Sequence, residues 1–315
     1  MRRKLRSPLP PRFGLDAARL RLPVDGPWET VRDHLVDRLP RVDPARIDAM
    51  LAGGEIVGVD GAVRPDTPFR PELVIWFHRD LPDEVPVPFR IEVVHRDERI
   101  VVVHKPHFLA SIPRGRHIQQ TALVRLRREL DLPELSPAHR LDRMTAGLLM
   151  FVVRRELRGR YQTMFRDRLV RKEYEAIAGF DPSVGLPCVV RSNIVKERGV
   201  IAARELPGPP NSETRVRLAE HRDGLGRYHL EPITGRTHQL RLHMASLGLP
   251  ILGDGIYPEL VEDDPADFSR PLQLLASTLA FTDPVTGEEL AFRSPGTLRA
   301  WTDHAGWAGG GAAGP

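Results

Sequence analysis

The sequence predicts an α+β protein in which a small unit precedes a larger one. Apolar runs of strand length and amphipathic helical stretches do not alternate strictly, which favours a mixed α+β fold over a doubly wound parallel sheet. The proline-rich stretch Leu81–Pro88 is the best candidate for a linker between the two units. With 41% apolar residues among 315, the chain can bury a sizeable core.

The part of the chain before the linker is expected to contain a flexible arm and a compact module. Residues 1–25 form the arm, which is basic and contains prolines. The module over residues 26–85 is predicted from a helix over 28–39, a second helix that Asp43 and Pro44 open and Gly53 ends, a hairpin over 55–63 that turns at Asp60-Gly61, and a strand over 73–77.

The longer part, residues 86–304, is expected to form one domain. Its predicted strands span 91–94, 100–103, 147–153, 172–178, 214–219 and 228–231, and its predicted helices span 121–130 and 155–168. Thr237 is expected to cap a further short helix that ends at Gly248. The Gly/Ala-rich tail, residues 305–315, is predicted to be disordered.

The positive charge is concentrated at the N-terminus. The net charge is +4, but residues 1–23 hold seven basic side chains and one acid, so this segment carries +6 and the remainder −2. Only four of the 46 basic residues are lysine. Arginine's planar fork suits phosphates and base edges, which favours a nucleic-acid partner. A GC-rich genome would produce the same composition without any such role.

The chain's single cysteine and its apolar runs exclude several classes of protein. Cys188 alone cannot form an intramolecular disulfide or a cysteine-clustered metal site, and it fits a reducing cytoplasm. No apolar run approaches the length of a membrane span, and no apolar stretch of signal-peptide length follows the basic N-terminus. We therefore expect a cytoplasmic protein without a membrane association.

Three motifs could carry chemistry. The strongest is the segment from His139 to Leu149, a charged loop that leads into an apolar strand and holds Asp142 at the edge of a core. In the second, Lys172 and Tyr174 share one face of a strand, where Tyr174 could stack on a base. The first motif could instead be a surface salt-bridge cluster before a buried strand. In the second, Tyr174 could instead be a half-buried core residue.

The third motif runs from Thr234 to His243. Arg236 projects from just before a helix N-terminus, a position that favours anions. His238 and His243 are five residues apart, which is not the zinc-binding spacing on a helix, so a metal site is not expected. Neither a phosphate-binding loop, a dinucleotide fingerprint nor a nucleophile elbow occurs in the sequence.

Together these motifs resemble the RluA-type RNA pseudouridine synthases. His139 to Leu149 is similar to the family's aspartate signature H-R-L-D-x-x-T-S-G-L-L, with Ala146 in place of serine. Residues 172–174 resemble its K-x-Y motif, and residues 234–243 its T-G-R-T-H-Q-I-R-V-H motif, which residues 251–254 continue. Lys105-Pro106 matches the start of the family's catalytic domain, although residues 107–116 depart from its pattern. The resemblance covers roughly residues 89–300.

The resemblance implies a function and a role for each motif. The fold would be a mixed, largely antiparallel sheet of pseudouridine synthase type, and the reaction would isomerise uridine in structured RNA, either ribosomal or transfer RNA, without a cofactor. Asp142 would be the catalytic carboxylate and Arg236 would pair with it. Tyr174 would stack on the uracil, and Arg140 would fill the gap that the extruded base leaves or hold a phosphate. The enzyme is expected to be a monomer.

The remaining expectations concern the small module and two competing functions. Residues 26–85 resemble the alpha-L-type RNA-binding module, two helices followed by a hairpin. One competing function is a catalytically inactive RNA-binding or ribosome-assembly factor, which the intact Asp142 argues against. The other is a metal-dependent nucleic-acid hydrolase, which would need a carboxylate or histidine cluster that the sequence does not offer.

Overall fold

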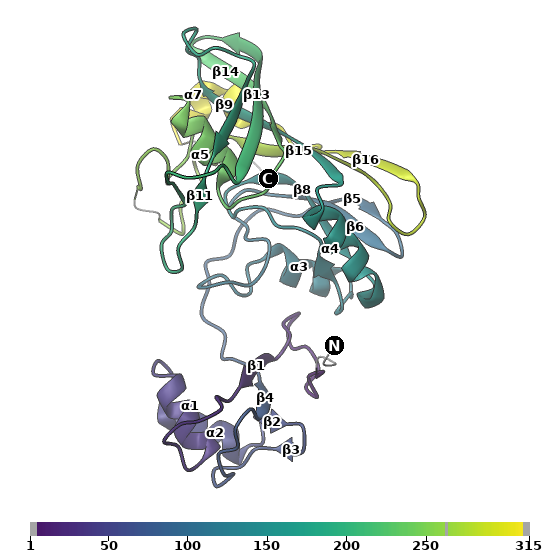
Figure 1. The fold of residues 1–315 in the computed structure, drawn as a ribbon, viewed down its shortest axis with the longest axis vertical. Coiled ribbons are helices and arrows are strands. Elements are labelled where there is room, and N and C mark those ends of the chain that lie inside the picture. Colours follow the sequence, from purple (N-terminus) through teal and green to yellow (C-terminus); the bar gives the residue numbers. More distant parts are fainter. Residues whose placement is uncertain (1–4, 262–263, 311–315) are drawn as a thin grey trace. The chain divides into compact units, whose positions relative to one another are not determined.

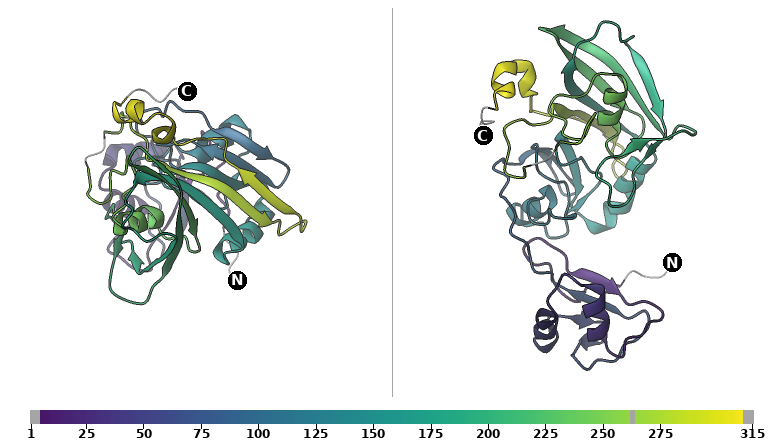
Figure 2. Two further views of the ribbon diagram at one scale, coloured as in Figure 1. Left: turned by 90° about the horizontal axis from the view of Figure 1, so that it is seen from above. Right: turned by 90° about the vertical axis from the view of Figure 1, so that its left-hand side faces the viewer.

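The chain divides into two compact units. The computed structural model describes residues 5–261 and 264–310 (Figures 1 and 2). One unit spans Met1–Pro82 and the other Asp83–Pro315. The division falls inside the proline-rich stretch, where the fixed φ of proline and its missing N–H disfavour helix and sheet.

The first unit packs two helices against a small sheet. Helix α1 spans Val31–Arg38 and helix α2 spans Pro44–Ala52, and both begin at side-chain caps. Thr30 and Asp33 form a capping box on α1, and Asp43 accepts a hydrogen bond from the Ala45 N–H at 2.9 Å. The strands are β1 (Ala18–Arg21), β2 (Val57–Gly58), β3 (Gly61–Ala62) and β4 (Val74–Phe77), in the order β1-β4-β2-β3.

Two expectations for this unit need correction. The flexible arm does not reach residue 25, because Ala18–Arg21 pairs antiparallel with β4 and Leu22 is only 2% exposed. Edge pairing with β4 and burial of Leu22 order a segment that composition alone marks as mobile. The hairpin also turns one residue earlier than predicted, since Gly58 pairs with Gly61 and leaves Val59 and Asp60 as the loop.

The second unit is built on one ten-stranded sheet, whose strands β13 and β14 are steeply inclined to β16 in Figure 1. Its main strand order is β10-β13-β14-β9-β15-β8-β6-β5, with β16 on β15 and β7 on β8. The bounds are β5 (Glu92–Arg96), β6 (Ile100–Lys105), β7 (Ser136–Pro137), β8 (Ala146–Val152), β9 (Val170–Gly179), β10 (Cys188–Ser192), β13 (Ser212–Arg222), β14 (Leu225–Pro232), β15 (Leu274–Thr282) and β16 (Glu289–Arg293). Strands β11 (Ile194–Val195) and β12 (Arg204–Glu205) form a separate pair. Within this sheet only β15 and β8 run parallel, so the predicted mixed, largely antiparallel α+β fold is confirmed.

Both faces of the central strand β8 are covered, which explains its unbroken apolar sequence. Leu149 and Phe151 pack with helix α3 (Ala122–Glu129) on one face. Leu148, Met150 and Val152 pack with helix α4 (Arg158–Arg166) on the other. The remaining helical segments are η1 (Arg155–Leu157), α5 (Gln239–Ser246), α6 (Arg299–Thr302) and α7 (His304–Ala308).

Gly147 allows β8 and β15 to lie side by side at the end of the Asp142 loop. Its φ is +111°, and a Cβ built there would lie 2.3 Å from the carbonyl oxygen of Ala276 on β15. Any larger residue would push the two strands apart. The glycine therefore fixes the entry of β8 beside β15.

The C-terminal expectation was wrong in part. Residues His304–Ala308 form helix α7, and Trp307 is 7% exposed, with its Nε1 donating to the Pro271 carbonyl at 3.1 Å. Burial of one large aromatic ring thus orders a segment that its glycine and alanine content marks as disordered. Residues 311–315 lie outside the described residues. Within residues 5–261 and 264–310, none of the helices combines the length and apolarity that crossing a bilayer demands.

Candidate active site

Two cavities meet at Asp142. The larger has a volume of about 1100 Å³ and the smaller about 480 Å³. Three side chains line both: Asp142, His238 and Arg241. Because Asp142 lies in the loop between β7 and β8 whereas the other two lie at the start of α5, the third motif has folded onto the first.

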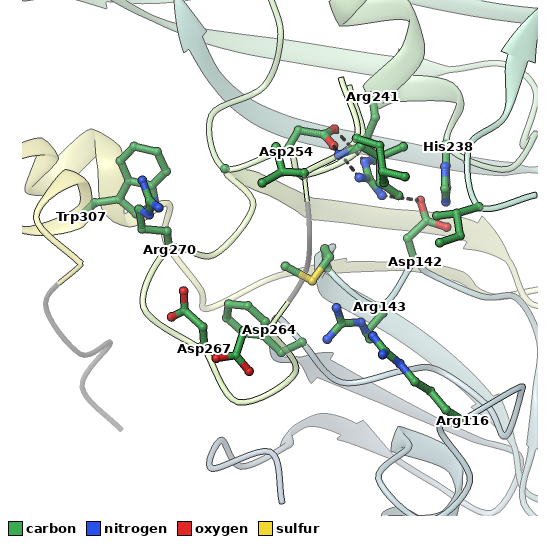
Figure 3. Close-up of a pocket in the computed structure, with 18 residues that line it drawn as sticks. Arg116, Asp142, Arg143, His238, Arg241, Asp254, Asp264, Asp267, Arg270 and Trp307 are labelled. Atoms are coloured by element: carbon green, nitrogen blue, oxygen red, sulfur yellow. Dashed lines mark hydrogen bonds and ion pairs between the residues drawn. The ribbon is translucent and has the colours of Figure 1, made fainter. Parts of the chain in front are cut away.

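The two cavities differ in character. Apolar side chains such as Phe108, Ile201 and Leu260 line the larger, together with charged groups that Figure 3 labels. The smaller is lined by Tyr174 and by a set of basic side chains: Arg140, Arg166, Arg168, Lys172 and Arg236. Four of the residues predicted for the site, Arg140, Asp142, Tyr174 and Arg236, therefore face one cavity. Its positive charge suits a polyanion such as a nucleic-acid backbone.

Arg241 is the ion-pair partner of Asp142. Its Nη1 lies 4.0 Å from Asp142 Oδ2, and its Nε and Nη2 donate to the two carboxylate oxygens of Asp254 at 2.7 and 2.5 Å. The guanidinium is 3% exposed and Asp254 is 1% exposed, whereas Asp142 keeps 30% of its surface. Figure 3 shows Asp142 pointing toward Arg241, with Asp254 on the opposite side of the guanidinium. A buried, bidentate pair therefore holds the arginine that faces the partly exposed carboxylate of Asp142.

Arg241 stays protonated in this environment. Burial by itself lowers its pKa, but the hydrogen bonds and charge of Asp254, with the charge of Asp142, outweigh burial and raise the pKa above its usual value. The guanidinium also lies over the ring of Tyr257, with its Cζ 5.6 Å from the ring centroid.

The predicted pairing of Arg236 with Asp142 is therefore corrected. Arg236 is exposed, and its Nε donates to the Asn211 carbonyl at 3.2 Å. It lies in the turn before α5, whereas Arg241 lies on the first turn of the helix and points back to the β7–β8 loop. The cap is also not Thr237, because α5 begins after His238, whose φ is +58°. The sequence contained the information needed to identify Arg241, because Arg241 lies within the third motif, residues 234–243, and Asp254 lies within its continuation, residues 251–254.

Gln239 holds the turn of the third motif against the sheet. Its amide nitrogen donates to the Glu213 carbonyl and to Thr214 Oγ1, both at 2.9 Å. Its amide oxygen accepts from Thr234 Oγ1 at 2.7 Å and from the Arg236 N–H at 3.0 Å. Because two of these bonds go to the turn and two to β13, all four form only when the turn lies against β13 in this position. Gln239 therefore positions the start of α5.

The backbone of the Asp142 loop is held by side chains of residues 105–111. Ser111 Oγ donates to the Leu141 carbonyl at 2.7 Å and accepts from its N–H at 3.0 Å. Lys105 Nζ donates to the Arg143 carbonyl at 3.2 Å, and His107 Nδ1 donates to the Met144 carbonyl at 2.7 Å. The Asp142 carbonyl accepts from the Thr145 N–H at 3.1 Å. Four consecutive carbonyls are thus satisfied, which fixes the position from which Asp142 projects.

Lys105 and His107 make these bonds from buried positions. Lys105 Nζ also donates to the carbonyls of Pro106 and Leu109, at 2.8 Å each. Burial lowers its pKa to about 7, although the charge of Asp142 opposes this; three carbonyl acceptors favour the ammonium form. Burial lowers the pKa of His107 to about 4, so this ring is neutral near pH 7 with its proton on Nδ1, because a carbonyl can only accept.

Tyr174 and Lys172 project from β9 into the smaller cavity. Burial, and then the charge of Asp142, raises the pKa of Tyr174, so the phenol remains protonated at neutral pH. Burial lowers the pKa of Lys172 below its usual value, and the charge of Arg168 adds to this. An aromatic face, a protonated hydroxyl and a carboxylate thus surround one cavity, an arrangement that can hold a planar base beside a nucleophile.

Comparison with known proteins identifies the family of the chain. Residues 99–246 match a family described as RNA pseudouridylate synthase. The chain is 36% identical over 220 residues to the dual-specificity RNA pseudouridine synthase RluA of Pasteurella multocida, which covers 65% of this chain and 93% of that protein. It is 33% identical over 209 residues to the protein of the same name from Escherichia coli K12, covering 64% and 92% of the two chains.

A solved structure has a similar fold. The human RNA pseudouridylate synthase domain containing 1 superposes with a TM-score of 0.52 at 24% identity. The match covers 68% of this chain and 87% of that chain.

Proposed function

Because the chain belongs to the RluA-type family of RNA pseudouridine synthases, we propose that it isomerises specific uridines in structured RNA with Asp142 as the catalytic carboxylate. The observation that carries this assignment is the place of Asp142, at the junction of two cavities beside a buried arginine. An inactive RNA-binding or ribosome-assembly factor is not favoured, since the relatives are enzymes and the aspartate is intact.

The reaction breaks the bond between C1′ and N1 and forms one between C1′ and C5. In one route Asp142 bonds to C1′ while the electron pair of the broken bond leaves with uracil N1. In the other, Asp142 takes the C2′ proton, a double bond forms between C1′ and C2′ to give a glycal, and the electron pair of the C1′–N1 bond again leaves with uracil N1. The uracil then turns and C5 bonds to C1′, while the bond from Asp142 to C1′ breaks in the first route or Asp142 returns its proton to C2′ in the second. The C5 proton is then lost and N1 gains a proton. Neither route changes oxidation state overall or requires a group carrier.

The other site residues have distinct proposed roles. Arg241 orients and stabilises the Asp142 carboxylate, in place of the role first expected for Arg236. Tyr174, which lines the smaller cavity, stacks on the uracil, and its hydroxyl helps to move the C5 proton. Arg140 and Arg236 are both exposed at the smaller cavity, where they would hold the phosphates that flank the extruded nucleotide.

The substrate is proposed to be ribosomal RNA or, alternatively, transfer RNA. The relatives' name, dual-specificity, makes it necessary to test both. Pseudouridines should be mapped by carbodiimide-dependent reverse-transcription stops in cells with and without the gene. Stops that vanish in the deletion strain, and return with the wild-type gene, identify the target; an unchanged map in both RNA classes would contradict the proposal.

The first unit is proposed to bind RNA as an alpha-L-type module. Helices α1 and α2, followed by the β2–β3 hairpin, support this assignment. We also propose that the enzyme is cytoplasmic, because its substrate is RNA and its only cysteine, Cys188, is free. We further propose that it acts as a monomer.

Replacing Tyr174 by phenylalanine is expected to keep stacking and to remove the hydroxyl. Turnover should fall by about 100-fold, in the range typical of a lost proton-transfer group, while the dissociation constant for RNA changes little. Tritium release from RNA labelled at uridine C5 measures the rate. The control Tyr174→Leu should lose binding as well; full activity in that variant would make Tyr174 a core residue only.

Deleting residues 1–11 is expected to weaken the salt dependence of RNA binding. This deletion stops before β1, so the first unit keeps its sheet, and it removes four basic side chains. If two to four of them contact phosphates, the slope of log K against log salt should flatten by about 1.4 to 2.8. The maximal rate at saturating RNA should not change. Equal slopes for the two proteins would place the binding surface elsewhere.

A further inference from the structure

His238 is the one side chain shared by both cavities that the reaction described above does not use. It lies beside Asp142 in Figure 3. Its ring is held by Tyr257, whose hydroxyl lies 3.2 Å from His238 Nδ1. The same hydroxyl is bonded to both backbone groups of Ala203, accepting from the N–H at 2.8 Å and facing the carbonyl at 2.9 Å.

These contacts determine which nitrogen of His238 carries the proton. The Tyr257 hydroxyl has one hydrogen to donate. If it donates to Ala203, which is 1% exposed, the buried carbonyl is satisfied and His238 Nδ1–H can donate to the phenol oxygen. If it donated to His238 instead, the Ala203 carbonyl would lose this bond inside the protein, at a cost of about 1–3 kcal/mol. The first arrangement satisfies every group.

The ring that results is neutral and has an acceptor at Nε2. Burial lowers the pKa of His238 below its usual range, although the charge of Asp142 opposes this. With the proton on Nδ1, the lone pair of Nε2 is available to a ligand in the cavities that His238 shares with Asp142. The left-handed backbone at His238, with φ at +58°, holds the ring in this position at the start of α5.

We propose that His238 Nε2 accepts a hydrogen bond from the 2′-hydroxyl of the target uridine and so selects ribose over deoxyribose. This inference rests on the proposed function. Asp142 must reach C1′ or the C2′ hydrogen in either route, so the sugar lies against the wall that Asp142, His238 and Arg241 form. Of these three, only His238 offers a neutral acceptor, and the 2′-hydroxyl is attached to the carbon next to C1′. The hydroxyl is the group by which proteins distinguish RNA from DNA.

Two substitutions test the acceptor at His238 Nε2 independently of the contact between His238 Nδ1 and Tyr257. His238→Asn tolerates the left-handed backbone and places its amide nitrogen where Nδ1 stands, but it ends before Nε2. His238→Gln places an amide oxygen near the position of Nε2 and gives up the Tyr257 contact. Thermal unfolding of both variants checks that each is folded.

The test compares binding of RNAs that carry uridine or 2′-deoxyuridine at the target position. Dissociation constants are measured in the Asp142→Asn background, so that neither RNA is converted. When His238 is present, the deoxy substitution should weaken binding about 3- to 10-fold, the value of one hydrogen bond. In the His238→Asn variant the two RNAs should bind equally, and in the His238→Gln variant most of the preference should return.

The same preference for ribose in the folded His238→Asn protein as in the parent would overturn the inference. Failure of the proposed function is a separate result, namely no tritium release from any uridine-containing RNA by the wild-type enzyme.

Discussion

Asp142→Asn is expected to reduce turnover at least about 1,000-fold while leaving RNA binding within roughly threefold of wild type. The amide keeps the shape of the side chain but can neither form a bond to C1′ nor take a proton from C2′. Arg241 still faces the position, and Lys105, His107 and Ser111 still hold the loop backbone, so the cavities should not change. Tritium release and filter binding measure the two quantities.

A matched control is available in the same cavity. Asp264 lines the larger cavity but is exposed, and Asp264→Asn removes the same charge away from the sugar. Its turnover should stay within about twofold of wild type. Asp142→Ala guards against slow deamidation of the introduced asparagine. If Asp142→Asn and Asp142→Ala both turn over within tenfold of wild type, Asp142 is not the catalytic carboxylate.

Arg241→Met is expected to have the second-largest effect. It leaves the buried Asp254 without its bidentate partner, which should lower the free energy of unfolding by about 3–5 kcal/mol. It also removes the guanidinium that faces Asp142, so turnover per folded molecule should fall by about 100-fold or more. Chemical denaturation measures the first effect, and single-turnover tritium release below the unfolding transition measures the second.

Two variants separate these effects. Asp254→Asn weakens the same buried pair but leaves Arg241 beside Asp142, so it should lose stability and keep turnover within about tenfold. Arg236→Gln should keep stability and lose mainly RNA affinity, because the Arg236 side chain is exposed and bonded only to the Asn211 carbonyl among the contacts described. Equal turnover in Arg241→Met and Asp254→Asn would reduce Arg241 to a structural role.

Features that depend on neighbouring residues were predictable from the sequence. The unbroken apolar sequence of residues 147–153 predicted a buried strand, and β8 is buried along its whole length. Asp43 and Pro44 predicted the start of a helix, and Asp43 caps α2. The ordered motifs around Asp142, Tyr174 and Thr234 predicted the family, which the comparisons confirmed. Periodicity and capping act within one or two turns, so the local sequence contains the required information.

Features that depend on distant segments were decided only by the tertiary structure. Strand β15 was not predicted, yet it lies between β9 and β8 in the middle of the sheet, where Gly147 admits it. Both arginines of the third motif are compatible with an aspartate partner in sequence. In the structure, Gln239 fixes the turn before α5 so that Arg241 faces Asp142, whereas Arg236 remains exposed.

The same distinction applies to the segments beside the site and at the chain's ends. Residues 105–111 hold the Asp142 loop through bonds that span 30 residues or more, and residues 18–22 and 304–308 are ordered by burial against the rest of their own units. Pairing and burial between residues far apart in sequence depend on which groups converge in space, and no local pattern specifies that convergence.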